Sequence, residues 1–425
     1  MPRHSYEAAE RFILSREFFG MKLGLENITE FLDTIGSPQN DYGTIHLAGT
    51  NGKGSTANML AAILSAQGYK TGLFTSPHLV SLRERVRVDG RMIPRPSVAA
   101  FLDRHRKELT RRKLSFFEVV TAMALEYFSR CGVDAAVIET GLGGRLDATN
   151  VLQPWLTLTT DISRDHLEIL GTTERKIARE KAGIIKPGVP HLAGILPPVA
   201  DKVIADRCRR LKAPLYRLNA GDFVPDDVRN RLDFHHNGWS VRRVQPGLSG
   251  PHQLRNAALA LKAVAVLNGE GVRISKRAVY EGLKSVAWPG RFQVVTRRFR
   301  PTLVFDVGHN AGGVAAFAET FRTRFPGRRA KVLTGFVKRK EHQKMFDLLA
   351  PITEHYTIVP LATKRSMDID EMCDSVNWRG VPVKRFRSLT TGWKHLERLT
   401  APDDIVVIIG SHFLVGEFFE KFGIK

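Results

Sequence analysis

The stretch HLAGTNGKGSTANMLAAILSAQ, residues 46–67, decides the fold of this chain. A short β-favouring run at residues 44–48 enters a glycine-rich loop, which leads into an apolar-periodic helix that begins near Ser55. Glycines let the loop turn its backbone N–H groups toward an anion, and the first turn of the helix adds its positive dipole end. The stretch therefore predicts a phosphate-binding loop between a strand and a helix.

This loop departs from the common G-x-x-x-x-G-K-[ST] phosphate loop at two positions. Leu47 stands where the first glycine belongs, and Gly54 separates Lys53 from Ser55. Lys53 would still place its charge on the outer phosphates, and Ser55 or Thr56 would place a hydroxyl near phosphate or Mg²⁺. The alternative is a plain glycine turn before a helix. We favour the phosphate loop because the strand, the lysine and the hydroxyls are all in register.

The composition is typical of a globular protein. The chain has 425 residues, of which 43% are apolar and 25% charged, and this length favours two domains. Cys131, Cys208 and Cys373 show no C-x-x-C spacing, which argues against a disulfide framework or a thiolate metal site and indicates a reducing compartment. The N-terminus lacks the apolar segment of a signal peptide, and the longest aliphatic run, residues 405–409, is too short to span a bilayer. We expect a cytoplasmic protein without a membrane partner.

The formal charge of +21 raises the question of a nucleic-acid partner. The lysines and arginines are spread over many predicted helices and loops, without one stripe interleaved with aromatic residues. A basic solvated surface is the preferred interpretation, and attraction of small polyanions such as ATP and polycarboxylates is the second. We therefore expect small-molecule substrates, no nucleic acid, and a monomer.

The rest of the chain alternates predicted strands and helices. Strands at residues 70–75, 135–139 and 156–162 alternate with helices, which predicts a parallel sheet with its ligands at the carboxyl ends of the strands. The segment 214–244 differs, because apolar alternation around Asn237 and Gly238 predicts a type I′ hairpin with antiparallel strands that border this sheet.

A break in the pattern at residues 288–293 marks the predicted domain boundary. After it the alternation restarts, and about 125 residues are enough for a small α/β domain. We predict domains at 1–290 and 291–425. The strands expected in the second domain lie near residues 302–307, 330–335, 355–360 and 404–409.

Three polar residues stand at or after the ends of predicted strands of the first domain. Glu139 is the last residue of one strand, and Ser76 and His166 follow two others. Taken singly, such residues are more often structural than functional. Beside a phosphate loop on the same sheet edge they become candidate Mg²⁺ ligands in a shell shared with ATP phosphates.

Eight motifs identify a family that the chain resembles. They occur in the order GTNGKGST, TSPHL, ERVRVDG, ETGLGGRLDATN, DHLEILG, REKAGIIK, PGRFQ and DVGHNAGG. Over residues 23–416 this order is similar to that of dihydrofolate synthase/folylpolyglutamate synthase, a branch of the Mur ligase superfamily. The resemblance implies an N-terminal Mur-ligase-type ATPase domain with a mostly parallel sheet and a smaller C-terminal Rossmann-like α/β domain. It also implies an ATP-dependent ligase of folate biosynthesis, in which ATP converts a carboxylate to an acyl phosphate that the amino group of L-glutamate attacks.

The resemblance also implies which residues bind the nucleotide and its ions. Magnesium is the expected metal, as two ions, with a monovalent cation as a further candidate. Lys181 matches a lysine that is carbamylated in relatives, although the sequence alone favours a helix lysine in a salt bridge. The implied catalytic residues are Lys53, His166, Lys181 and His309. The implied metal ligands are Ser76, Glu139 and His166. The implied ATP contacts are Thr50, Asn51, Gly52, Lys53, Gly54, Ser55, Asn256, Arg291 and Asp306.

The substrate contacts follow from the same resemblance. On the glutamate side they are His309 and Ser411. Phe116 and Phe117 are equally well explained as core residues at the start of a helix. The implied pteridine-side contacts are Lys22, Leu23, Phe116, Phe117, Glu118, Arg145, Leu146 and Asp147.

Other functions are weighed against this expectation. A cell-wall Mur ligase would need a nucleotide-sugar-binding domain before the phosphate loop, and 48 residues are too few for it. A basic nucleic-acid-binding ATPase is motivated by the charge alone, and a catalytically dead scaffold is disfavoured by the intact Lys53, Glu139 and His166. Within the family we predict both glutamate addition to dihydropteroate and extension of the γ-linked tail, with a monofunctional folylpolyglutamate synthase as the alternative.

Overall fold

The computed structural model describes residues 4–19, 24–165, 167–338, 341–377 and 380–423. Its contacts divide the chain into two units. Unit 1 comprises residues 1–224, 232–245 and 255–286, and unit 2 comprises residues 225–231, 246–254 and 287–425. Each unit is built on one large α/β sheet, so the predicted fold class is confirmed. The division into domains at residue 290 stays a prediction.

The sheet of unit 1 has eight strands in the order β4-β3-β2-β5-β1-β6-β7-β8. Along this order, the neighbouring strands from β2 to β8 are parallel. The strands β3 and β4 are antiparallel and are joined by a turn at Asp89 and Gly90. The strands are β1 (Gly43–Ala48), β2 (Thr71–Phe74), β3 (Val86–Val88), β4 (Arg91–Met92), β5 (Ala135–Glu139), β6 (Leu156–Thr159), β7 (His191–Ala193) and β8 (Leu215–Arg217).

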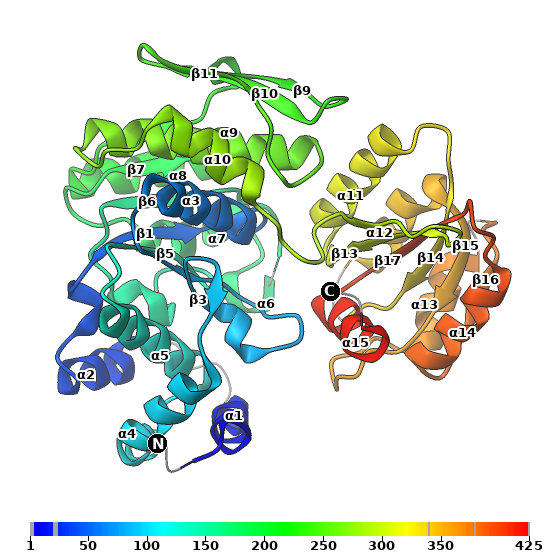
Figure 1. The fold of residues 1–425 in the computed structure, drawn as a ribbon, viewed down its shortest axis with the longest axis horizontal. Coiled ribbons are helices and arrows are strands. Elements are labelled where there is room, and N and C mark those ends of the chain that lie inside the picture. The colour runs from blue at the N-terminus through cyan, green and yellow to red at the C-terminus, as the bar shows by residue number, and fades with distance from the viewer. Residues whose placement is uncertain (1–3, 20–23, 166, 339–340, 378–379, 424–425) are drawn as a thin grey trace. The chain divides into compact units, whose positions relative to one another are not determined.

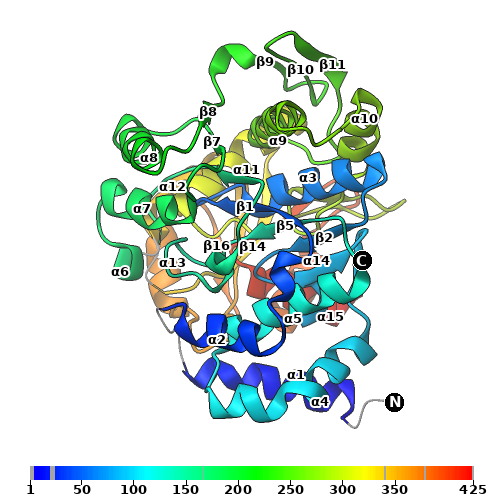
Figure 2. The same ribbon diagram turned by 90° about the vertical axis from the view of Figure 1, so that its left-hand side faces the viewer.

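Helices cover both faces of this sheet. Helices α3, α9 and α10 lie over one face, and α5 lies on the other with α1, α2 and α4 outside it (Figures 1 and 2). The helices of the first 286 residues are α1 (Tyr6–Ser15), α2 (Glu26–Thr34), α3 (Lys53–Gln67), α4 (Arg95–Arg111), α5 (Phe116–Cys131), α6 (Leu167–Leu170), α7 (Glu174–Lys181), α8 (Pro198–Leu211), α9 (Pro251–Gly269) and α10 (Lys276–Ser285).

Alternation along β5 sets which side chains face the phosphate-loop helix. Ala136 and Ile138 belong to the hydrophobic cluster shared with α5. Successive strand residues point to opposite faces of a sheet, so Glu139 points to the face covered by α3. This orientation brings the carboxylate of Glu139, at the end of β5, close to Lys53, the first residue of α3.

The predicted hairpin is present, but its predicted place is wrong. Asn237 and Gly238 have φ of 44° and 78° and join β10 (Arg231–His236) to β11 (Trp239–Val244), as a type I′ turn requires. These strands form a separate three-stranded sheet with β9 (Phe223–Asp226) and do not border the large sheet. That edge is occupied by the three-residue strand β8, which pairs in parallel with β7 and is too short to give a periodic signal.

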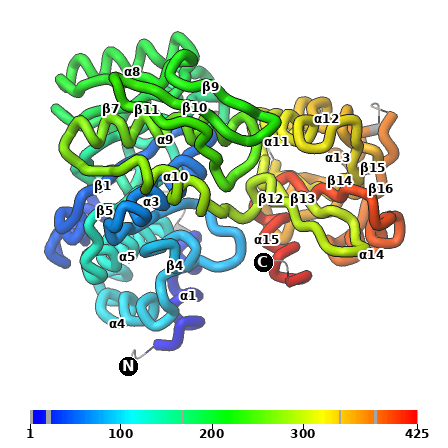
Figure 3. Tube along the Cα trace, turned by 45° about the horizontal axis from the view of Figure 1, so that its top comes forward, coloured from blue at the N-terminus to red at the C-terminus, as the bar shows by residue number. Residues whose placement is uncertain are grey.

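Unit 2 has a six-stranded sheet in the order β12-β13-β17-β14-β15-β16, and among its described strands only β12 is antiparallel to its neighbour. The trace of this unit passes through β12, β13, β14, β15 and β16 in Figure 3. Val304 of β13 belongs to the core that includes Phe317 and Phe346, while Phe305 packs on Phe418 of α15 with ring centroids 5.3 Å apart. Helices therefore cover both faces. The elements are β12 (Gln293–Val295), β13 (Thr302–Asp306), α11 (Ala311–Arg324), β14 (Ala330–Thr334), α12 (His342–Leu349), β15 (Thr353–Ile358), α13 (Ile369–Asn377), β16 (Val383–Arg385), α14 (Leu389–Leu399), β17 (Ile405–Ile409) and α15 (His412–Phe422).

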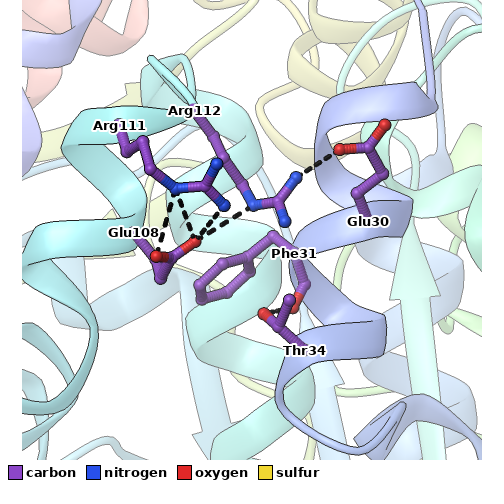
Figure 4. Close-up of polar contacts among 6 residues, drawn as sticks. All are labelled: Glu30, Phe31, Thr34, Glu108, Arg111 and Arg112. Carbon is purple, nitrogen blue, oxygen red and sulfur yellow. Dashed lines mark hydrogen bonds and ion pairs between the residues drawn. The ribbon is translucent and has the colours of Figure 1, made fainter.

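A group of charged side chains ties α2 to the end of α4 (Figure 4). Arg112 lies between Glu108 of α4, at 3.3 Å from Nε to Oε2, and Glu30 of α2. Arg111 contacts the same Glu108. Because Glu30 is largely exposed, this pair contributes little, and the apolar packing of Phe31 against Phe101 does more to hold α2.

Close packing of α10 on α3 gives a prediction about stability. A Cβ atom added at Gly282 would lie 2.6 Å from Cα of Ile63 in α3. Gly282→Ala should therefore lower the free energy of unfolding by about 1–3 kcal/mol, because neither backbone can move aside cheaply. Thermal and urea unfolding measure this. The matched control is Gly269→Ala in α9, where nothing lies within 4 Å and no loss is expected. Equal unfolding of the two variants would contradict the packing argument.

Candidate active site

The phosphate loop follows β1 and ends at the first residue of α3. Gly52 caps the helix with φ of 83°, a conformation that favours glycine, and α3 has no acidic residue in its first turn. A Cβ at Gly52 would lie 2.6 Å from Oδ1 of Asn256, so two predicted nucleotide contacts are neighbours. Gly54 and Ser55 are buried in the first turn of α3. The first turn of this long helix thus contributes no acidic side chain of its own, which favours an anion at its N-terminus.

The segment after β6 fastens the phosphate loop. The Thr50 amide donates to the carbonyl of Asp161 at 2.8 Å, and its hydroxyl donates to the carbonyl of Ser163 at 3.1 Å. Asn51 Nδ2 donates to Oδ2 of Asp161 at 3.3 Å, and the Thr160 hydroxyl donates to the carbonyl of Asn51 at 2.7 Å. The sequence did not single out Thr160, Asp161 or Ser163, and their only signal was their position at or just after the end of the predicted strand 156–162.

Lys53, Glu139 and Ser76 meet at the carboxyl edge of the sheet. Lys53 Nζ lies 3.8 Å from Oε1 of Glu139, and the Ser76 amide donates to Oε2 of the same carboxylate at 3.0 Å. Lys53 also donates to the carbonyls of Gly49 and Thr50, at 3.0 and 3.2 Å. The strand order explains this meeting, since β5 lies between β2 and β1. His166, the third predicted metal ligand, lies outside the described residues.

The oxygen donors at this edge could hold a hard cation such as magnesium. Within the described ranges, no three His, Cys, Asp or Glu side chains form a group that could hold a metal ion. Magnesium does not need such a group, because it is usually held by one or two carboxylates together with phosphate oxygens and water. Glu139 beside the phosphate loop, with Ser76 next to it, fits that pattern.

Lys181, the last residue of α7, is buried under the phosphate loop. Its Nζ donates to the carbonyl of Gly49 at 2.7 Å, the same carbonyl that Lys53 contacts. Burial, and then the charge of Lys53, lower the pKa of Lys181 to about 7, although Asp161 and Asp165 act in the opposite direction. The part of the chain that is described places no carboxylate within 4.0 Å of Nζ. The salt bridge favoured by the sequence is therefore not formed, and a sizeable fraction of this amine is neutral near pH 7.

The two phenylalanines at the start of α5 lie at the border between the hydrophobic core and the candidate active site. The ring of Phe117 occupies the space of a side chain at Gly141, just after β5, and lies 5.9 Å from the ring of Phe74. Phe116 is partly buried, with the guanidinium of Arg85 5.1 Å above its ring. Both interpretations of these phenylalanines, core and ligand wall, are compatible with this position.

Glu118 has a structural task. Its Oε2 accepts from the amide and hydroxyl of Ser115, at 2.8 and 2.7 Å, which completes a capping box for α5. The pattern S-x-x-E is visible in the sequence and signals this cap. A role of Glu118 in substrate binding stays a prediction.

The segment 145–147 is likewise held by local bonds. Asp147 Oδ1 accepts from the amide and hydroxyl of Thr149, and its Oδ2 accepts from the Leu142 amide. Burial raises the pKa of Asp147. Arg145 is mostly exposed and pairs with Glu180 at 3.0 Å, and Leu146 is half-buried. Substrate contacts of these residues stay predictions, and Lys22 and Leu23 lie outside the described residues.

In unit 2 a buried acid and an arginine stand at the carboxyl end of β13. Asp306 accepts from the amides of Phe292 and Gly308, at 2.8 and 2.7 Å. Burial raises the pKa of Asp306 to about 6, and the charge of Arg291 acts in the opposite direction. Nε of Arg291 is buried and has no hydrogen-bond partner among the described residues. An unbonded buried donor is the kind of atom that a bound anion would satisfy.

His309 and Ser411 are brought together because β13 and β17 are neighbours. His309 follows β13, and its ring centroid lies 5.6 Å from that of His412, the first residue of α15. Ser411 is buried, and its hydroxyl caps α15 by accepting from the Leu414 amide at 3.0 Å. The two predicted glutamate-side residues thus share one edge of the second sheet.

Comparison with known proteins assigns the family. Residues 47–264 match the Mur ligase middle domain, and residues 290–412 match the Mur ligase glutamate ligase domain. The dihydrofolate synthase/folylpolyglutamate synthase of Bacillus subtilis is 33% identical over 97% of this chain and 98% of its own length.

Solved structures agree with this match. Escherichia coli FolC in complex with DHPP and ADP has a TM-score of 0.87 at 28% identity, covering 99% of this chain and 98% of its own. The bifunctional Yersinia pestis enzyme complexed with AMPPNP and Mn ion has a TM-score of 0.87 at 27% identity, covering 99% of both chains. Since the likeness extends over both units and nearly the whole length, this chain belongs to the dihydrofolate synthase/folylpolyglutamate synthase family of ATP-dependent ligases.

Proposed function

We propose that this chain adds L-glutamate to dihydropteroate and to the γ-carboxylate of tetrahydrofolate polyglutamates, with cleavage of ATP. The observation that carries this proposal is the meeting of Lys53, Glu139 and Ser76 beside a phosphate loop, in a chain that matches its relatives almost from end to end. An amide ligase needs a nucleoside triphosphate and a carboxylate at one place. At this edge of the sheet, Lys53 supplies a positive charge that can attract both.

The phosphates of ATP would be held by the loop 50–55. Its amides and the dipole of α3 favour negative charge, and Lys53 adds a full positive charge. Asn256 next to Gly52 would contact the nucleotide from α9. Arg291 and Asp306 stay predicted nucleotide contacts. ADP and AMPPNP complexes of relatives support nucleotide binding.

Magnesium would be held by Glu139 and Ser76, together with His166 and the phosphate oxygens. The manganese ion in the Y. pestis relative supports a divalent cation in this family. When bound, magnesium neutralises charge on the phosphates during transfer. A second ion would need a further anion, which carbamylated Lys181 would supply.

The reaction would then proceed in two displacements. A carboxylate oxygen of the substrate forms a bond to the γ-phosphorus as the bond to ADP breaks, giving an acyl phosphate. The amino group of glutamate next attacks the acyl carbon, its proton is released, and phosphate leaves. Lys53 stabilises the charge of the transferring phosphoryl group, and the remaining residues act by position. Phe116 and Phe117 would line the pteridine side, and His309 and Ser411 the glutamate side.

The first test is a comparison of two acceptors. Purified protein with ATP, Mg²⁺ and L-glutamate should release ADP with dihydropteroate and with a tetrahydrofolate, because both present a carboxylate to the same phosphoryl group. A coupled assay measures the release of ADP, and mass spectrometry measures the mass of the product. Omission of glutamate is the control. Activity with the tetrahydrofolate alone would leave a monofunctional folylpolyglutamate synthase. ADP release that needs nucleic acid and ignores glutamate would overturn the proposal.

Three accompanying expectations stay predictions, namely a monomer, a cytoplasmic location and the lack of a nucleic-acid partner. Among the residues that the structure describes, no helix is long and apolar enough to cross a membrane. Small-molecule substrates are supported by the nucleotide and DHPP complexes of relatives.

A further inference from the structure

Arg85 is a buried arginine next to the candidate active site. It ends the short helix Leu82–Arg85 just before β3 and is only 7% exposed. Its guanidinium lies 5.1 Å above the ring of Phe116. It belongs to the ERVRVDG motif, to which neither the sequence nor the proposed chemistry has given a task.

Arg85 also holds the loop that carries Ser76. Its carbonyl accepts from the Thr75 amide at 3.1 Å, and its Nε donates to Nδ1 of His78 at 2.8 Å. Ser76 stands between these two points and donates its own amide to Glu139. The guanidinium is thus fixed in orientation by His78 on one side and Phe116 on another.

The terminal nitrogens of Arg85 have no carboxylate partner among the described residues. Burial lowers the pKa of Arg85 to about 10, and the charges of Glu139, Glu17 and Glu84 act in the opposite direction. No described carboxylate oxygen lies within 4.0 Å of the guanidinium. Burial of a charge without such a pair is costly, and the planar guanidinium fork matches a carboxylate in a bidentate manner. A fixed, buried and unpaired guanidinium is therefore suited to an incoming carboxylate.

We propose that Arg85 binds the carboxylate of the pteroyl substrate through its terminal nitrogens, oriented by His78 and stacked on Phe116. This inference rests on the proposed function, because it takes the acceptor to be an aromatic acid. Lys53 already faces the phosphates, whereas Arg85 faces an aromatic ring. A benzoyl carboxylate offers both an aromatic plane and a charge. Arg85 would in addition stabilise the acid in the place where it becomes phosphorylated, next to Glu139.

Direct binding tests this contact through matched ligands. The dissociation constants of dihydropteroate and of its carboxamide are measured by fluorescence titration, with ADP and Mg²⁺ present. The wild-type protein should bind the carboxylate roughly tenfold to a hundredfold more tightly than the carboxamide, as expected for charge-assisted hydrogen bonds. Arg85→Ala should lose this preference while its affinity for ADP changes less than about threefold.

Two further variants keep the test decisive. Arg91→Ala removes an exposed arginine of β4 and should leave the carboxylate preference unchanged, which controls for total charge. Arg85→Lys keeps the charge but loses the fork and the Nε bond to His78, so most of the preference should be lost. If Arg85→Ala does not fold, as judged by circular dichroism, Arg85→Lys gives the same comparison.

The outcomes separate this inference from the proposed function. An Arg85 variant that keeps the wild-type preference for the carboxylate would overturn the inference, although normal turnover by the wild-type protein would leave the function standing. A parallel loss of ADP affinity would also overturn it, because Arg85 would then act only on the loop of Ser76. A wild-type protein that neither binds dihydropteroate nor releases ADP with any folate would overturn both.

Discussion

Replacement of Lys53 by alanine should lower glutamate-dependent ADP release by about 10²–10³-fold or more with both acceptors. Its ammonium stands at the start of α3, 3.8 Å from Glu139 and in contact with the carbonyl of Gly49. There it would neutralise charge on the transferring phosphoryl group, and loss of one such group typically has this magnitude. Since phosphoryl transfer is common to both acceptors, kcat/KM should fall by the same factor for each. Steady-state kinetics with dihydropteroate and a tetrahydrofolate measure it.

The control for this variant is Lys107→Ala, which removes an exposed lysine from α4 and should not change either rate. Circular dichroism shows whether the Lys53 variant keeps its fold. Near-normal activity of Lys53→Ala would mean that the loop does not hold the phosphates. A loss confined to one acceptor would contradict a shared phosphoryl-transfer step.

The fold was predictable where local chemistry and global position agree. The glycine loop, the continuous buried runs of β1 and β5 and the S-x-x-E start of α5 each favour a local conformation that agrees with the final sheet. The meeting of Ser76, Glu139 and Lys53 followed because carboxyl ends of adjacent parallel strands share one edge. No long-range information beyond the alternation of strands and helices was needed for it.

Contacts between distant segments were less predictable. The strand β8 has only three residues, which are too few to show a strand pattern in the sequence. Its place at the edge of the sheet depends on its pairing with β7. The bond between Arg85 and His78 joins two motifs whose facing side chains depend on the turn after β2. The carboxylate of Asp147 accepts hydrogen bonds from Thr149 and Leu142, which the sequence did not indicate, and its contact with substrate stays a prediction. A sequence motif indicates that a residue has a specific task. It does not show whether that task is a structural hydrogen bond, such as a helix cap, or contact with a ligand.

Lys181 should be essential and should respond to carbon dioxide. A lysine with its pKa lowered to about 7 is about half neutral at pH 7, whereas one with the ordinary value of 10.5 is neutral in only about one molecule in three thousand. The neutral amine can form a bond to carbon dioxide with loss of a proton, and the resulting carbamate is an anion that could bind a second magnesium. Enzyme freed of carbon dioxide should therefore lose most of its activity, and bicarbonate should restore it.

The pH dependence and a variant complete this prediction. At a fixed concentration of dissolved carbon dioxide, restoration should be faster at pH 8 than at pH 6, since the neutral amine increases through the lowered pKa. Lys181→Gln should lose activity by roughly 10²-fold and should not respond to bicarbonate. If Lys181 only donates to the carbonyl of Gly49, the variant should instead lose affinity for ADP, and bicarbonate should not affect the wild-type enzyme. The two roles of Lys181 therefore predict different responses of the wild-type enzyme to bicarbonate. This difference distinguishes them without relying on the variant alone.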